Sequence, residues 1–327
     1  MQVHFLGPDG VTAYDVGALP GLLARTDGIT WVDVPAWSDD VEELLRTRLD
    51  AHPMELDACR RRNHVPTVHG YPTHLFVVLH SPEAGERGHV HLLELDQLVG
   101  ERVLVTVHGP INPEVPIERA LADTDAVRRR LEAGRLRPTS AAELSHAIVS
   151  TIVRRQRAAV DLVAERVPDL EHRVMEGDFR RPEALLEEMF LLRHELITVR
   201  TMAAQAHEIF ARIAGLHQDM PGVDAARAGD LADQFDRVRS IADGERQFLF
   251  GVIDLYQTRV TTKMTLAMER LAVIAAITLP VTALASIYGM NVIVNDSTHW
   301  TQLVFIVAVM LMISGLLLRW ARKQGWW

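Results

Sequence analysis

The sequence has almost no cysteine, and long stretches near its C-terminus have no charge. Cys59 is the only cysteine among the 327 residues. A single chain therefore forms neither an intramolecular disulfide bond nor a zinc site made of several thiolates. Residues 271–294 carry no formal charge, and His299 is the only ionisable residue in 297–318. These absences predict a large domain suited to the reducing cytosol, followed by a membrane-embedded C-terminal region.

Signals for secretion and for nucleic-acid binding are also missing. The N-terminus has no basic segment followed by an apolar core, so we expect no secretory signal and place the membrane-targeting information in the C-terminal spans. The net charge is −9, which argues against a nucleic-acid partner because such surfaces need clustered Lys and Arg. This charge suits attraction of cations, although an ordinary acidic cytosolic domain also carries it.

Signatures of catalysis are absent as well. His194-Glu195 begins like the helix of a zinc protease, but Thr198 stands where the second histidine is required. The sequence has no phosphate-binding P-loop and no glycine fingerprint for a dinucleotide. We therefore expect a protein that is not an enzyme and has no cofactor.

Residues 1–115 have the pattern of a cytosolic α/β domain. Short β-branched or leucine-rich runs of strand length alternate with helical stretches. The expected strands are 29–34, 74–80, 90–95 and 102–108, and the expected helices are 39–49 and 54–61. This alternation predicts an α/β sandwich rather than an all-β domain.

Long helices replace the strand pattern after residue 115. Ser140 and Glu143 form a capping box at the start of one helix, and Pro182 suits the first turn of the next. We expect residues 116–222 to form a cytosolic helical hairpin region. Residues 224–288 then continue as one helix of about 95 Å, at 1.5 Å per residue, which is too long for a globular core.

The last part of this helix and a second apolar segment are long enough to span a membrane. Residues 271–288 give about 27 Å of helix against a hydrocarbon core of about 30 Å, and 303–318 are nearly all aliphatic. We assign a stalk (223–270), a first span (271–291), an extracytoplasmic loop (292–302), a second span (303–320) and a cytoplasmic basic-aromatic tail (321–327).

The charges beside the two spans predict their orientation. Arg270 precedes the first span, and Arg319, Arg322 and Lys323 follow the second. The loop 292–302 contains no Lys or Arg. Because basic residues stay on the cytoplasmic side, we expect both termini to be cytoplasmic.

A short motif at the end of the first span carries a family resemblance. The residues are Tyr288, Gly289, Met290 and Asn291, followed by a short loop, a second span and a basic tail. Further segments match in order and spacing, namely Trp31-Val32-Asp33-Val34, His52-Pro53, Pro66-Thr67-Val68, the run 103–108 and Asp254-Leu255-Tyr256. Over nearly its whole length the chain resembles the CorA family of magnesium and cobalt channels.

The resemblance implies an α+β membrane protein with a cytosolic α/β sandwich, a helical stalk and two C-terminal transmembrane helices. It also implies a homopentamer in the inner (plasma) membrane, with the first span of each copy around a central pore. The expected partners are further copies of the chain, membrane lipid and divalent cations. Independently of the resemblance, two spans from one chain cannot enclose a water-filled path, so the sequence itself requires an oligomer.

One stripe of the first span is the candidate pore lining. Small or weakly polar residues, with Met and Leu among them, recur there at steps of three and four, which places them on one helix face. The candidates are Thr265, Met268, Leu271, Ala275, Leu279, Thr282 and Ser286. Close packing of helices in lipid also explains small residues such as Ala275, whereas Thr282 and Ser286 favour a pore.

The first span contains no carboxylate, the obvious ligand for a bare divalent ion. Because magnesium gives up its water reluctantly, a ring of Asn291 amides with Gly289 or Met290 carbonyl groups would hydrogen-bond to a hydrated ion. Asn291 and Gly289 would also suit the C-terminal cap of the helix, and the two roles are compatible.

Regulation in the family involves divalent ions bound between cytosolic domains. Asp230 and Asp233 on the stalk resemble the acidic positions involved, and Glu83 is the candidate opposing ligand. Acidic residues on a long helix also serve simply as a solvated face.

The identity of the ion stays open at this stage. The loop after Asn291 lacks the Met-Pro-Glu-Leu stretch common in magnesium-transporting members. A zinc transporter of the same superfamily is one alternative, with cobalt and nickel as further candidate ions, but the 15 histidines suggest no clear site. A non-conducting membrane-anchored sensor or scaffold is the other alternative.

Overall fold

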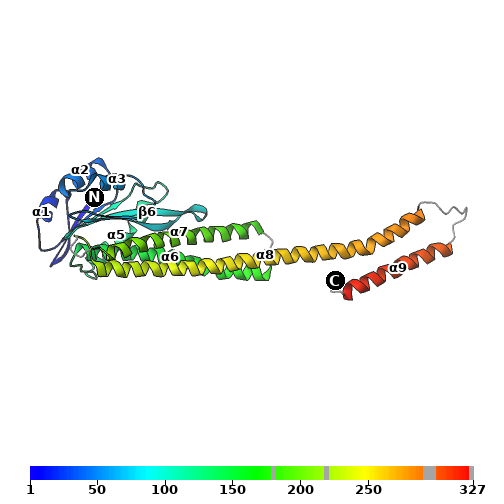
Figure 1. Cartoon of the computed structure of the whole chain (residues 1–327). Helices are drawn as coiled ribbons and strands as arrows, with labels where there is room; N and C mark the ends of the chain where they lie inside the picture. Colours follow the sequence, from blue (N-terminus) through cyan, green and yellow to red (C-terminus); the bar gives the residue numbers. More distant parts are fainter. Residues whose placement is uncertain (178–181, 217–220, 290–299, 324–327) are drawn as a thin grey trace. The chain divides into compact units, whose positions relative to one another are not determined.

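The computed structural model describes residues 1–177, 182–216, 221–289 and 300–323. The chain divides into two compact units, residues 1–173 with 178–252 and residues 174–177 with 253–327. The first unit contains a sheet with helices on both faces (Figure 1), and the second contains helical segments that are apolar. The predicted fold class, an α/β sandwich with a long helix and two apolar C-terminal helices, is confirmed.

Seven strands form one mixed sheet. They are β1 (Gln2–Gly7), β2 (Gly10–Tyr14), β3 (Ile29–Val34), β4 (Thr67–Gly70), β5 (Leu75–Ala84), β6 (Val90–Val99) and β7 (Val103–His108). Their order is β2-β1-β3-β7-β6-β5-β4, in which β3 and β7 pair in parallel and the other neighbours pair antiparallel. The sequence did not predict β1, β2 or β4, and it ended β5 and β6 too early.

Helices α1 (Leu19–Leu23), α2 (Asp39–Arg48) and α3 (Pro53–Arg60) cover one face of the sheet. The Ser38 hydroxyl oxygen accepts a hydrogen bond from the Val41 N–H and so caps α2. Leu45 and Leu56 belong to the same buried apolar cluster as Phe76 of the sheet. This face therefore provides the main apolar core of the domain.

Helices α4 (Ile117–Ala120), α5 (Ala122–Glu132) and α6 (Ala141–Glu176) follow the sheet in sequence, and polar contacts tie the other sheet face to α6. Trp31 Nε1 donates to Thr106 Oγ1 within the sheet over 3.0 Å. Gln156 Nε2 on α6 donates to the carbonyl oxygen of His80 over 3.1 Å. These bonds satisfy buried polar groups that would otherwise destabilise the interface.

The longest helices are α6, α7 (Pro182–Ala214) and α8 (Ala225–Gly289), and α9 (Trp300–Lys323) follows the loop after α8. Glu143 N–H donates to Ser140 Oγ at the start of α6, as the capping box predicted. In the first unit, Phe210 on α7 stacks on Phe235 of α8 with ring centroids 5.7 Å apart.

Gly222, just before α8, occupies a position that a side chain would disrupt. Its φ is +80°, and a Cβ atom there would lie 1.8 Å from the carbonyl oxygen of Val99. We expect Gly222→Ala to lower the free energy of unfolding by about 2 kcal/mol or more. The cost of overpacking adds to the cost of placing alanine in the left-handed backbone conformation. Gly229→Ala is the control, since a Cβ atom meets nothing within 4 Å there. Thermal unfolding of the purified proteins tests this, and equal midpoints for both variants would contradict it.

Candidate ion pathway and regulatory residues

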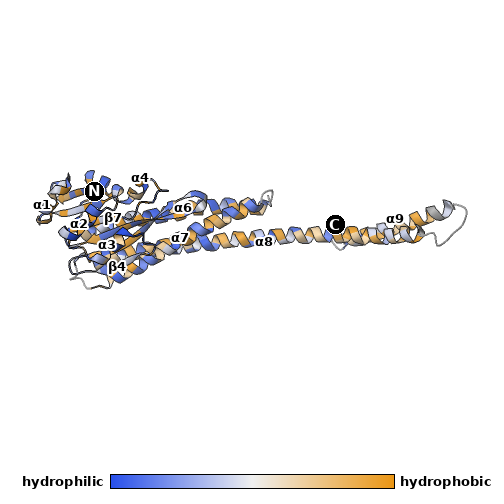
Figure 2. Cartoon of the chain, turned by 90° about the horizontal axis from the view of Figure 1, so that it is seen from above, coloured by the Kyte–Doolittle hydropathy of each residue, from blue (hydrophilic) through white to orange (hydrophobic). Residues whose placement is uncertain are grey.

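Among the described residues, two helical segments have the length and apolar composition to cross a membrane, one within Ala225–Ile287 and the other Val304–Lys323. Only 6% of the most apolar window of each is buried inside the chain. Figure 2 shows hydrophobic residues along the C-terminal part of α8 and along α9. A core helix of a soluble protein would be mostly buried, so these exposed apolar surfaces require lipid or other chains as partners.

The predicted pore-lining residues lie on α8 and are open to their surroundings in the single chain. Leu271 and Leu279 are 65% and 67% exposed, and Ala275 is half-buried. The Thr265 and Thr282 hydroxyl groups donate to carbonyl oxygens four residues earlier, at 3.0 and 2.8 Å. Each donating hydroxyl keeps oxygen lone pairs, which can accept hydrogen bonds from the water shell of a cation.

A polar stripe on α8 precedes this segment, and the sequence reasoning missed it as a unit. Threonine, glutamine and acidic side chains line one side of the helix at steps of three and four. They are Asp254, Gln257, Thr258, Thr261, Thr262, Thr265 and Glu269. The spacing of these residues in the sequence could have predicted the polar stripe, because Thr258, Thr261 and Thr265 continue the stripe of the first span towards the stalk.

The selectivity motif is only partly described. Tyr288 and Gly289 form the last helical positions of α8. Met290, Asn291 and the following loop up to residue 299 lie outside the described residues. The predicted role of the motif therefore stays a prediction.

Asp230, the predicted regulatory residue, contacts α6. Its Oδ2 atom lies 2.8 Å from His146 Nε2 and accepts a hydrogen bond from Gln234 over 2.7 Å. The hydrogen bond from His146 is the main cause that lowers the pKa of Asp230 below its ordinary value. Asp233 is exposed one turn further along α8. Both carboxyl groups are thus on the surface of α8, and Asp230 is ionised at neutral pH.

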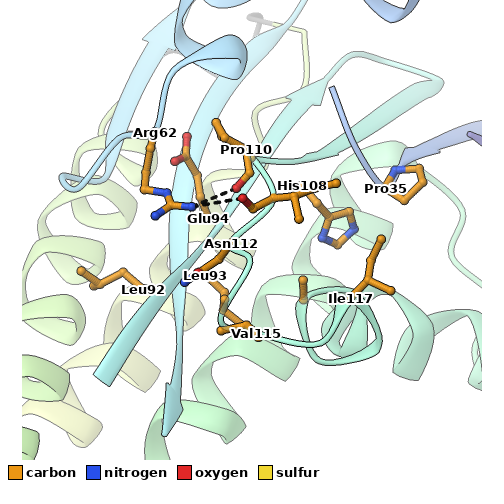
Figure 3. A pocket seen from close by; sticks show the side chains of 13 residues that line it. Pro35, Arg62, Leu92, Leu93, Glu94, His108, Pro110, Asn112, Val115 and Ile117 are labelled. Carbon is orange, nitrogen blue, oxygen red and sulfur yellow. Dashed lines mark hydrogen bonds between the residues drawn. The ribbon is translucent and has the colours of Figure 1, made fainter. Parts of the chain in front are cut away.

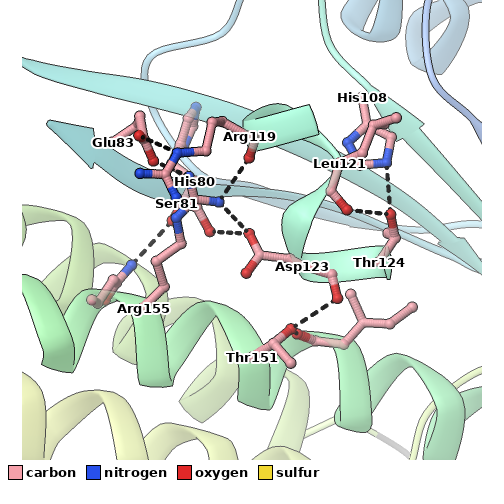
Figure 4. A network of polar contacts seen from close by, with 12 residues as sticks. His80, Ser81, Glu83, His108, Arg119, Leu121, Asp123, Thr124, Thr151 and Arg155 are labelled. Carbon is pink, nitrogen blue, oxygen red and sulfur yellow. Dashed lines mark hydrogen bonds and ion pairs between the residues drawn. The ribbon is translucent and has the colours of Figure 1, made fainter. Parts of the chain in front are cut away.

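Glu83 on β5 lies in a network of polar contacts (Figure 4). It forms ion pairs with Arg119 and Arg155, and its side chain is only 14% exposed. Arg155 Nη1 also lies 3.1 Å from Asp123 Oδ2, which accepts a hydrogen bond from Ser81 over 2.6 Å. Two guanidinium groups already neutralise Glu83, so a metal ion would have to displace both.

The single chain does not bring Glu83 into contact with Asp230. Glu83 meets α6 at Arg155, whereas Asp230 meets α6 at His146, two and a half turns away along the helix. In the part of the chain that the structure describes, no three His, Cys, Asp or Glu side chains are placed to hold one metal ion. A regulatory site formed between copies of the chain stays a prediction.

Comparison with known proteins identifies the family. The family model described as CorA-like Mg²⁺ transporter protein matches residues 26–323. The chain belongs to this family. The match includes both apolar helices and the sheet domain from β3 onward, so this CorA-family chain is a membrane protein of a divalent-cation transporter family.

Individual CorA-family relatives match over most of their length. The cobalt/magnesium transport protein CorA of Thermotoga maritima is 24% identical over 307 residues, covering 91% of this chain and 83% of that protein. The zinc transport protein ZntB of Pectobacterium carotovorum is 24% identical over 240 residues, covering 71% and 69%. The complete structure of the CorA magnesium transporter from Methanocaldococcus jannaschii superposes with a TM-score of 0.82 at 15% identity, covering 100% and 99%. The last match shows that the whole fold is shared.

Proposed function

We propose that the chain is a subunit of a divalent-cation channel that passes hydrated Mg²⁺, with Co²⁺ and Ni²⁺ as further substrates. The observation that carries the proposal is the exposed face of α8, which runs from the threonines at 258–265 to Thr282 and Ser286 in the apolar segment. In the described part of a single chain, the threonine and serine side chains of this face are exposed. Several copies, five by the family resemblance, would place it around a central path.

The chemistry of this face favours an ion that keeps its water. The apolar part of α8 supplies hydroxyl groups and aliphatic side chains and no carboxylate to replace the water shell of Mg²⁺. Leu271 and Leu279 would narrow the path, while Thr282 would accept hydrogen bonds from the shell. The Asn291 amide would complete a polar ring at the outer mouth, because it follows the end of α8.

The proposed orientation places the sheet domain and both termini in the cytoplasm and the two spans in the inner (plasma) membrane. Arg322 and Lys323 lie in the last turn of α9, and the sequence 292–302 contains no Lys or Arg. Basic residues remain on the cytoplasmic side of the membrane. Lipid would then cover the apolar surface of α9, which includes Phe305 and Leu311, each 69% exposed.

Zinc is the second candidate substrate, because a ZntB relative matches the chain at the same 24% identity as the CorA relative, over a shorter part of the chain. Competition distinguishes the two ions. Liposomes that contain the purified protein are loaded with a fluorescent magnesium indicator. Zn²⁺, Co²⁺ or Ni²⁺ is then added outside the liposomes in increasing amounts. We expect Mg²⁺ entry that excess Co²⁺ reduces. Zn²⁺ entry without Mg²⁺ entry would assign the chain to zinc, and no entry of any ion would favour the scaffold alternative.

Internal Mg²⁺ is proposed to favour closure through acidic residues on the stalk. We expect Asp230→Lys to raise the internal Mg²⁺ concentration needed for half inhibition by about tenfold, because the variant replaces an attractive charge by a repulsive one. Asp230→Asn removes the charge and keeps the shape of the side chain, since an amide oxygen can still accept the His146 hydrogen bond. Asp161→Lys, at an exposed pair with Arg157 on α6, is the control. An unchanged inhibition curve in both Asp230 variants would remove this residue from regulation.

A further inference from the structure

Asp96 is a carboxyl group at the centre of the sheet with no charge partner. It lies on β6 and is completely buried. Val78 on β5 and Val107 on β7 are its register neighbours, and both are buried. The Cys59 thiol of α3 lies above it. An ionised carboxylate in such an apolar setting is strongly disfavoured unless a donor or a cation compensates it.

The nearest polar group is another carboxyl group. Glu94 lies two residues earlier on the same face of β6 and interacts with Asp96. The oxygens of Glu94 accept hydrogen bonds from the Asn63 backbone N–H over 2.7 Å and from Asn63 Nδ2 over 2.6 Å. Neither oxygen of Asp96 has a hydrogen-bond partner among the described residues. Two acceptors therefore face each other, and apart from the weak S–H donor of Cys59 only a proton supplies the missing donor.

We infer that Asp96 and Glu94 form a buried proton-binding pair that holds one proton at neutral pH, with the Asp96 hydroxyl donating to the Glu94 carboxylate. The pair then carries one negative charge, which the Asn63 donors stabilise at Glu94. Burial raises the pKa of Asp96 well above its ordinary value, and the charge of Glu94 raises it further. Burial also raises the pKa of Glu94, against the opposing effect of Asn63.

The groups facing the pair do not supply a compensating cation to Asp96. On α3, Cys59 is a thiol whose pKa burial raises, and Glu55 adds negative potential at Cys59. On β5, His80 is the register partner of Glu94, and burial lowers its pKa, so its imidazole is neutral at pH 7. Arg62 acts on Glu94 rather than on Asp96, and its Nη2 atom donates to the carbonyl oxygen of Pro110.

A small cavity gives the proton a route to solvent. Figure 3 shows Glu94 beside Arg62, His108 and Asn112 in this cavity, which has a volume of about 30 Å³. That volume is sufficient for a water molecule. Asp96 does not line the cavity, so its proton leaves through Glu94. On deprotonation the pair changes from one negative charge to two, and the proton passes to water.

The consequence is a pH-dependent stability of the sheet domain with a defined sign. Because the pKa of Asp96 in the folded state lies above its unfolded value, the stabilisation is full at low pH and is lost as pH rises through the folded value. Asp96→Asn fixes a neutral side chain of the same shape. We therefore expect its thermal midpoint, relative to that of the natural protein, to rise as the pH increases.

Infrared spectroscopy and thermal unfolding of the full-length protein in lipid nanodiscs test the inference between about pH 5 and pH 9. We expect a carbonyl band of a protonated carboxyl group at neutral pH that disappears in Asp96→Asn, together with a midpoint difference that grows with pH. Asp236→Asn, at an exposed pair with Arg239, should leave both unchanged. Glu94→Gln should shift or remove the band as well. A band that persists in Asp96→Asn, or a midpoint difference independent of pH, would overturn the proton-binding pair, whether or not the chain conducts ions.

Discussion

Replacing Asn291 by alanine is expected to reduce divalent-cation flux through the reconstituted protein by about tenfold or more. The amide is proposed to hydrogen-bond to the water shell of the ion at the outer end of α8, where the first span offers no carboxylate as an alternative. Loss of about 1.4 kcal/mol of differential stabilisation corresponds to a factor of ten. The reduction in flux should be larger if the Asn291 amide of each copy in a ring contributes to this stabilisation.

The matched control for this prediction is Asn295→Ala, which changes the same residue type in the loop that follows. Flux is measured with an ion-sensitive dye in liposomes that contain equal amounts of folded protein. The control should transport like the natural protein. Normal flux and unchanged ion preference in Asn291→Ala would exclude the proposed polar ring.

Replacing Arg155 by methionine is expected to destabilise the sheet domain by about 3 kcal/mol. Arg155 compensates Glu83 and Asp123, whose side chains are 14% and 9% exposed, so its loss leaves two nearly buried carboxylates with fewer partners. Arg119 still pairs with Glu83, and Ser81 still donates to Asp123, which keeps the effect below complete unfolding.

Arg157→Met is the control for this variant, because Arg157 lies two residues further along α6 and pairs only with the half-exposed Asp161 in the described contacts. Exposed pairs of this kind contribute about 0–1 kcal/mol. Thermal or urea unfolding, followed by tryptophan fluorescence, compares the two variants. Equal destabilisation by both would show that the Glu83 network does not stabilise the domain.

Local patterns in the sequence predicted the elements whose signals are themselves local. Pro182 begins α7 as expected, and Ser140 caps α6. One detail differs, because Glu143 reaches back to the backbone N–H of Thr139 rather than to that of Ser140. The capping signal thus located the helix start, while the final hydrogen bonds depended on the preceding turn.

Buried polar residues explain which features the sequence reasoning did not predict. The predicted strand 90–95 ended before Asp96, yet β6 continues to Val99 with Asp96 buried, although an acid is rarely a core residue. Glu83 looked like an available ligand, but its partner Arg155 lies 72 positions away, so no local pattern could reveal their contact.

The structure of a single chain supports the predicted pore stripe and the predicted regulatory residues to different extents. The stripe depends on helical periodicity alone, and α8 contains all of its residues, but its role as a pore lining stays a prediction. A regulatory site between copies depends on an interface that periodicity does not define. Asp230 therefore has a described neighbour in His146, while its proposed counterpart across an interface stays a prediction.

Mg²⁺ influx into liposomes that contain only the purified full-length protein is the most direct measurement of the central claim. If several α8 helices surround a cation path, influx should rise with the amount of protein, saturate with external Mg²⁺ and decrease when Co²⁺ competes. Liposomes without protein provide the background. Correctly folded, membrane-inserted protein that transports none of Mg²⁺, Co²⁺, Ni²⁺ or Zn²⁺ above this background would contradict the assignment as a channel.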